Sequence, residues 1–240
     1  MEEARAAMLE LFPEGFEERD DGAGVELAAY TDTAGEKRAL AAFDDITAVD
    51  AVEGWEDRWR EFHHGVRVGP LWVGPPWEQP PEGVPAVVIE PGRAFGTGAH
   101  PTTRLCLELL AELPRGSLLD VGCGSGVLAI AGAKLGFAPV HAVDLDPVAV
   151  ETTIANAAAN GVDVDASVRD ALAAELPETG TTVANLTLDD VRMLAPLNGS
   201  PSLVTSGYLA ADDVGLPGRT GRRRGTLDGW AADVWESADE

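Results

Sequence analysis

Two carboxylates and a set of closely spaced glycines mark the stretch of this chain that could do chemistry. Asp120 opens the run Asp-Val-Gly-Cys-Gly-Ser-Gly, residues 120–126, and Asp144 follows Gly122 by 22 residues. Glycines let a backbone approach a ligand closely, and a carboxylate at the end of the next strand accepts hydrogen bonds from the hydroxyls of a ribose. This spacing indicates a site for a ligand that contains adenosine. The alternative is a glycine turn with a purely structural role.

The charge beside the glycines favours one class of adenosine ligand. Dinucleotide sites usually read G-x-G-x-x-G, whereas Gly122, Gly124 and Gly126 read G-x-G-x-G and Val127 takes the last position. Asp120 would repel a pyrophosphate, but it would stabilise the sulfonium and ammonium groups of S-adenosylmethionine. S-adenosylmethionine is therefore the expected cofactor, and a nicotinamide-dependent oxidoreductase is the least favoured class.

A β-α-β unit is expected to hold these residues. Residues 118–121 form a short apolar run before the glycines, and residues 140–143 form a second one before Asp144. Helices are predicted over residues 127–135 and 147–160, each followed by a glycine suited to a C-cap. Asp146 is placed to cap the second helix, whose first residue is a proline.

Further strands are expected on both sides of this unit. Strands over residues 164–168, 181–186 and 202–209 would extend the sheet, with Asp170 and Asn185 at the ends of the first two, and another strand is predicted over residues 86–90. The loop over residues 91–103 is a candidate lid. Thr102 or Thr103 would cap the helix that runs to Leu113, and His100 would serve as an acid–base group or order the loop by a hydrogen bond.

The first part of the chain is expected to be separate from this sheet. Residues 1–52 predict a small α+β substrate-recognition domain with a hairpin, a helix over residues 34–43 and a strand over residues 46–52. Residues 53–85 predict a helix with the aromatic stripe Trp55, Trp59 and Phe62, followed by a proline-rich linker. Residues 86–240 would then form the catalytic domain.

Composition excludes several functions. A net charge of -24 argues against general nucleic-acid binding; it would either steer a basic substrate or keep the protein soluble. The basic cluster of Arg219 and residues 222–224 would contact RNA or an acidic partner near Arg222, or form a solvated loop, with the closing strand pair over residues 225–235. No stretch predicts a membrane span or signal peptide, so a cytoplasmic location is expected. His63 and His64 lack a third ligand, so no metal site is expected, and Cys123 lacks a nearby base that would make it a nucleophile.

Two segments together resemble the ribosomal protein L11 methyltransferase family. They are Glu-Pro-Gly-Arg-Ala-Phe-Gly-Thr-Gly-Ala-His-Pro-Thr-Thr at residues 90–103 and Asp-Val-Gly-Cys-Gly-Ser-Gly-Val-Leu-Ala-Ile-Ala at residues 120–131. The resemblance implies an α/β fold with the class I methyltransferase doubly wound (Rossmann-like) sheet and a small N-terminal α+β domain. It implies an enzyme that transfers methyl groups from S-adenosylmethionine to lysine side chains and the N-terminal amine of ribosomal protein L11.

The resemblance also implies roles for single residues. It assigns the cofactor to Thr103, Gly122, Asp144 and Asn185, with Asp170 near the adenine, and it makes Asn185 the catalytic residue that orients the amine. The sequence departs from the family after Asn185, where it reads Leu-Thr-Leu-Asp. An ordinary strand-end asparagine, a class I methyltransferase for another protein or a small amine, and a non-catalytic S-adenosylmethionine-binding module therefore stay open. The sequence indicates no oligomeric state.

Overall fold

The computed structural model describes residues 64–90 and 98–238 and, before residue 64, Met8, Leu11 and residues 17–20, 25–29, 31, 33–43 and 46–47. The chain divides into two compact units, Met1–Phe62 and His63–Glu240. The predicted helix with Trp55, Trp59 and Phe62, and residues 91–97 of the candidate lid, lie outside the described residues. None of the helices among the described residues is long and apolar enough to cross a membrane.

The first unit contains the predicted hairpin and helix. Strands β1 (Glu17–Asp20) and β2 (Val25–Ala28) pair antiparallel, and α2 (Thr33–Ala42) follows. Apolar side chains from α2, β2 and the residues around them form a small core: Met8, Leu11, Leu27, Ala29, Ala39, Phe43 and Ile46. Of the strand predicted over residues 46–52, the structure describes only residues 46 and 47, and these are not in a strand.

The proline-rich stretch is a loop within a small sheet. Strands β3 (Val66–Val68), β4 (Leu71–Gly74) and β5 (Ala86–Val88) form this sheet in sequence order. Strands β3 and β4 are separate because Gly69 turns the chain between them at a φ of +56°. Since β4 and β5 pair in parallel across residues 75–85, this stretch connects paired strands, and the division between the units lies earlier, after Phe62.

A seven-stranded sheet forms the centre of the second unit, in the order β11-β12-β10-β9-β6-β7-β8. All neighbours pair in parallel except β12, which is antiparallel to β10 and β11. The strands are β6 (Leu118–Val121), β7 (Val140–Asp144), β8 (Asp165–Val168), β9 (Thr181–Asn185), β10 (Ser202–Leu209), β11 (Arg219–Leu227) and β12 (Trp230–Ser237). This is the doubly wound class I sheet that the sequence predicts.

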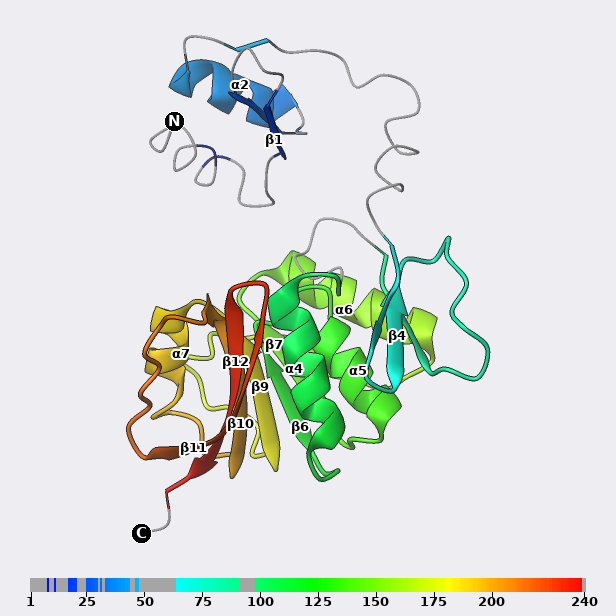
Figure 1. The fold of residues 1–240 in the computed structure, drawn as a ribbon, viewed down its shortest axis with the longest axis vertical. Helices are drawn as coiled ribbons and strands as arrows, with labels where there is room; N and C mark the ends of the chain where they lie inside the picture. The colour runs from blue at the N-terminus through cyan, green and yellow to red at the C-terminus, as the bar shows by residue number, and fades with distance from the viewer. Residues whose placement is uncertain are drawn as a thin grey trace. The chain divides into compact units, whose positions relative to one another are not determined.

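Helices cover the two faces of this sheet unequally (Figure 1). Helices α4 (Pro101–Glu112), α5 (Val127–Leu135) and α6 (Pro147–Asn160) lie along one face, with the small sheet packed against α5 and α6. The short helix α7 (Leu188–Leu194) covers the other face. Neighbouring residues of β10 therefore belong to different cores: Val204 lies in the core under α4, and Leu203 lies in the core under α7.

Residues 210–218 connect β10 to β11 without a helix. Val214 and Leu216 of this loop are buried in the core under α7, so these two apolar side chains cover this part of the sheet. The strand pair after the loop begins at Arg219, earlier than the predicted residue 225. Asp228 and Gly229 form its turn, with φ values of +49° and +82°, which is the two-residue geometry that Asp-Gly favours in hairpins.

Candidate functional site

The glycine run forms a tight turn at the carboxyl end of β6. The backbone N–H groups of Gly122 and Cys123 donate to the carbonyl of Val143 at 2.8 and 3.1 Å. Gly122, Gly124 and Gly126 have φ values of +72°, +53° and +81°, a region that residues with a side chain rarely adopt. These values explain why the sequence needs glycine at all three positions.

Helix α6 holds the turn from one side. The Thr153 hydroxyl donates to the carbonyl of Gly124 at 3.1 Å, and the Asn156 amide donates to the carbonyl of Ser125 at 2.9 Å. A Cβ atom added at Gly126 would lie 2.9 Å from the Thr153 side chain, so the turn and the helix are in close contact. Sequence reasoning missed both supporting residues, because nothing local distinguishes them from other polar residues on a helix.

Asp144 ends β7 and binds the glycine turn directly. Its Oδ2 accepts a hydrogen bond from the N–H of Gly124 at 2.9 Å, and its Oδ1 accepts from the N–H of Asp146 at 3.0 Å. Asp146 in turn caps α6 by accepting from Val148 N at 2.8 Å, as the sequence predicts. Because each carboxylate oxygen has further lone pairs, Asp144 is fixed in place and still able to accept hydrogen bonds from a ligand.

Asp120 is a buried carboxyl with one oxygen that lacks a partner. It is 1% exposed, and its Oδ2 accepts from the N–H of Ala129 in the first turn of α5 at 3.0 Å. Its Oδ1 is buried without a hydrogen-bond partner among the described residues. Burial raises the pKa of this carboxyl to about 7; the Ala129 hydrogen bond opposes the shift, and the charge of Asp144 adds to it. A bound cation would stabilise the ionised form here, so the residues fit the positive end of S-adenosylmethionine.

Asn185 ends β9 and contacts the start of α4. Its Nδ2 donates to the hydroxyl of Thr102 at 3.1 Å. Thr103 is also buried, and its hydroxyl has no hydrogen-bond partner in the part of the chain that the structure describes. Neither threonine caps α4: the N-cap is His100, whose Nδ1 accepts from the N–H of Thr102. The loop-ordering hydrogen bond expected of His100 is thus observed, and burial lowers the pKa of its imidazole.

Asp170 lies two residues beyond β8, in an exposed turn. Its Oδ1 accepts from the N–H of Leu172 at 2.9 Å. The strand order β9-β6-β7-β8 places Asn185, Asp120, Asp144 and the segment of Asp170 side by side along the carboxyl edge of the sheet. The predicted site residues therefore come together at one edge, Thr103 reaching it from the first turn of α4.

Two exposed leucines flank this edge and were not predicted. Leu145, which is 67% exposed, follows Asp144, and Leu172, which is 37% exposed, follows Asp170 by two residues. Exposed apolar side chains beside hydrogen-bonding groups suit a planar base, which has two apolar faces and a polar edge. The signal in the sequence was an apolar residue placed after a strand-end carboxylate.

Other candidate sites have structural explanations. Burial raises the pKa of the Cys123 thiol to about 12, so the thiol stays protonated and weakly nucleophilic. His64 contacts Glu78 at 2.8 Å, while His63 lies outside the described residues. Among the residues described, no group of three or more His, Cys, Asp or Glu side chains could hold a metal ion.

The basic cluster lies on β11, and its side chains bind other residues of the same chain. Arg222 pairs with Glu236 at 2.6 Å, Arg223 pairs with Glu112, and Arg224 lies 3.9 Å from Asp233. Arg219 donates to the carbonyls of Ser200 and Asn198. The expectation of a loop here is wrong, because Arg219 and residues 222–224 all lie on β11, which pairs with β12.

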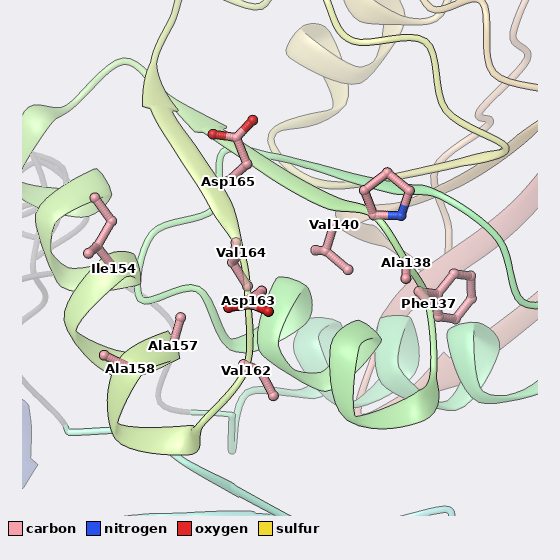
Figure 2. Close-up of a pocket in the computed structure, with 11 residues that line it drawn as sticks. Phe137, Ala138, Val140, Ile154, Ala157, Ala158, Val162, Asp163, Val164 and Asp165 are labelled. Atoms are coloured by element: carbon pink, nitrogen blue, oxygen red, sulfur yellow. The ribbon is translucent and has the colours of Figure 1, made fainter.

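A cavity of about 740 Å³ lies far from these residues along the sheet. It opens between α6 and the amino ends of β7 and β8 and is mainly apolar, as Figure 2 shows with Ile154, Ala157 and Val162. Asp163 and Asp165 lie at its rim. Since parallel α/β sheets bind ligands at the carboxyl ends of their strands, this cavity is not the site that the glycines and carboxylates build.

Comparison with known proteins places these features in one family. A family model described as ribosomal protein L11 methyltransferase (PrmA) matches residues 16–211. A protein of that name from Bordetella parapertussis is 52% identical over 113 residues, which are 46% of this chain and 36% of the relative. Another from Thiobacillus denitrificans is 47% identical over 154 residues, which are 60% of this chain and 51% of the relative. The chain thus spans about half, or less, of the length of these curated relatives.

A solved structure agrees with this placement. The ribosomal protein L11 methylase from Lactobacillus delbrueckii subsp. bulgaricus is 27% identical, with a TM-score of 0.65. The match covers 73% of this chain and 100% of that one.

Proposed function

The chain belongs to the ribosomal protein L11 methyltransferase family, and from this premise we propose that it transfers methyl groups from S-adenosylmethionine to lysine side chains and the N-terminal amine of ribosomal protein L11. The observation that carries the proposal is the buried oxygen of Asp120 that has no hydrogen-bond partner among the described residues, beside a glycine turn that Asp144 holds. A buried carboxylate costs free energy unless a positive group pairs with it. The site therefore suits a cationic adenosine ligand better than a pyrophosphate.

Each site residue has a role that its position supports. Asp144 would bind the ribose hydroxyls, Asp120 the positive end of the donor, and Thr103, Gly122 and Asn185 the rest of the methionine portion. Gly124 and Gly126 keep the backbone close to the ligand, and Asp170 with Leu145 and Leu172 would surround the adenine. When bound, S-adenosylmethionine supplies a methyl group that its sulfonium activates.

The protein would contribute alignment and a dry pocket. The acceptor nitrogen must be neutral, yet an unperturbed lysine with a pKa of about 10.4 is only about 0.04% neutral at pH 7. Desolvation lowers the pKa of a buried lysine, so no separate base is required. Asn185 would accept a hydrogen bond from the amine and hold it in line with the methyl group.

Donor binding tests the first half of the proposal. Calorimetry should detect S-adenosylmethionine binding to the wild type, and Asp144→Ala should weaken it at least about tenfold, because hydrogen bonds to a charged group contribute about 1.5–3 kcal/mol. Asp163→Ala is the matched control, since Asp163 is exposed near the cavity of Figure 2, at the opposite edge of the sheet. Unchanged affinity in Asp144→Ala would refute the assignment.

Acceptor identity tests the second half. Mass spectrometry of ribosomal protein L11 incubated with enzyme and donor should show added methyl groups. The structure around Asn185 is the reason to test other acceptors as well. After Asn185, Thr187 caps the seven-residue helix α7, and the loop over residues 210–218 has no helix. Small amines and other ribosomal proteins should therefore be run in parallel. Donor binding without transfer to any of them would favour the non-catalytic module.

A further inference from the structure

We propose that Thr102 is a positioning residue, whose hydroxyl fixes which end of the Asn185 carboxamide faces the acceptor amine. The inference rests on the proposed function, because it assigns Asn185 to the amine. Three side chains form a continuous chain of hydrogen bonds: Asn185 Nδ2 lies 3.1 Å from Thr102 Oγ1, and that oxygen lies 2.8 Å from His100 Nδ1. This series of hydrogen bonds links the end of β9 to the N-cap of α4.

The chemistry of the three groups gives the chain one direction. An amide nitrogen only donates, so the Thr102 hydroxyl accepts from Asn185. Nδ1 of His100 accepts from the Thr102 N–H at 3.4 Å as the N-cap, and a nitrogen that accepts carries no proton. The Thr102 hydroxyl must therefore donate its hydrogen to Nδ1. His100 is therefore the tautomer protonated at Nε2, in agreement with a pKa that burial lowers.

Packing keeps this arrangement in place. Thr102 is 2% exposed, so water does not compete for its hydroxyl. The Trp230 ring contacts the imidazole edge-on, with the ring centroids 5.1 Å apart. Thr103 cannot replace Thr102, because successive residues of a helix point about 100° apart.

The consequence appears at the other end of Asn185. With Nδ2 directed to Thr102, Oδ1 is the end left for the acceptor, and it has no hydrogen-bond partner among the residues that the structure describes. A neutral amine donates a hydrogen to this oxygen and keeps its lone pair for the methyl group. Without the Thr102 hydroxyl, the carboxamide can turn by about 180° and present its NH₂ group, which cannot accept from the amine.

The test compares Thr102→Val, which removes the hydroxyl at nearly constant shape, with Thr102→Ser, which restores it. We expect Val to lower kcat on ribosomal protein L11 about tenfold, within the range of one hydrogen bond, and Ser to recover most of it. Donor affinity is measured by calorimetry in both variants and kcat is measured at saturating donor, so that a change in the contact of Asn185 with the donor is separated from a change at the acceptor amine. Thr152→Val is the matched control, since this half-buried threonine bonds only within α6 and should leave both measurements unchanged.

A spectroscopic readout does not depend on turnover. The side-chain NH₂ signals of Asn185 are identified in a ¹H–¹⁵N spectrum as the pair that is lost in Asn185→Ala. They should shift in Thr102→Val and return in Thr102→Ser. Signals and kcat that stay at wild-type values in Thr102→Val overturn the proposal. Equal losses in Val and Ser also overturn it, because shape and not the hydroxyl would then be responsible.

A second pair of variants examines the chain from its other end. His100→Asn keeps an acceptor at the N-cap, whereas His100→Ala removes it. His100→Asn should keep the Asn185 signals and kcat at wild-type values, whereas His100→Ala should shift the signals and lower kcat in the manner of Thr102→Val. Equal behaviour of the two variants contradicts the proposal. A wild type that binds no donor refutes the proposed function instead, while the Asn185 signals still decide the positioning role.

Discussion

At the scale of single residues, the site is defined by side chains whose hydrogen bonds are incomplete. Asp144 has two backbone donors and spare lone pairs, whereas Asp120 has one donor and a buried oxygen with none among the described residues. Buried polar groups usually have partners. The deficit at Asp120 thus indicates where a ligand belongs more specifically than the size of a cavity does.

The raised pKa of Asp120, about 7, predicts a pH dependence of donor binding. A cation binds the ionised carboxylate, so donor affinity should fall by up to about tenfold per pH unit below pH 7. Binding should also release about 0.9 proton at pH 6, measured by calorimetry in two buffers of different ionisation enthalpy. Asp120→Asn should abolish this release, and Asp163→Asn should not.

The same pKa affects folding with a defined sign. The folded state holds the Asp120 proton more tightly than the unfolded chain does, whose carboxyl has a pKa near 3.8. Asp120 therefore lowers the free energy of unfolding as pH rises from about 4 to about 7. In the donor-binding experiment, equal proton release from the wild type and from Asp120→Asn would show that a group other than Asp120 titrates.

Residue types and spacing predicted the donor side of the site well, because its signals are local. The glycines, Asp146 as a cap and Asp144 at a strand end each depend on neighbours close in sequence. His100 as the cap of α4 was not predicted, since histidine is not a common N-cap. The Thr102–Asn185 contact was not predicted either, because it joins residues 83 positions apart.

At the scale of elements, the largest difference from expectation is the C-terminal strand pair. Four arginines within six residues look like a solvated loop when only composition is considered. In the fold, Arg219 begins β11 and binds the segment after α7 by donating to Asn198 and Ser200. Long-range pairing decides this strand, and a local pattern does not contain it.

Arg219 should therefore matter for stability far more than its neighbours. Burial lowers the pKa of its guanidinium, and its removal leaves buried acceptors without partners. Arg219→Met should lower the free energy of unfolding in urea by about 1–3 kcal/mol. Arg222→Met breaks an exposed ion pair with Glu236 and should cost about 0–1 kcal/mol. Similar losses in the two variants would contradict the structural role of Arg219.

At the scale of the whole molecule, charge is the dominant property. The net charge of -24 repels nucleic acid, and it would attract a basic acceptor over distances comparable to the Debye length, about 10 Å at 0.1 M salt. The pairing of the arginines on β11 with carboxylates or backbone carbonyls leaves little positive surface there for RNA.

Salt should consequently separate association from chemistry. Raising KCl from about 50 to 500 mM should lower kcat/KM for ribosomal protein L11 about tenfold and leave kcat almost unchanged, because electrostatic steering acts on encounter. A small amine with no other charged group, if it is methylated, serves as the control, and its kcat/KM should depend less on salt. A kcat/KM that is independent of salt would mean that the charge serves solubility alone.

The edge-on contact of Trp230 with His100 has a consequence for anyone who recombines members of this family. Trp230 belongs to the β11–β12 hairpin, whereas His100 is the N-cap of α4, more than a hundred positions earlier in the sequence. A chimera with a crossover anywhere from residue 104 to residue 229 would inherit the two from different parents. Such hybrids should take the β11–β12 hairpin and residues 98–104 from the same parent.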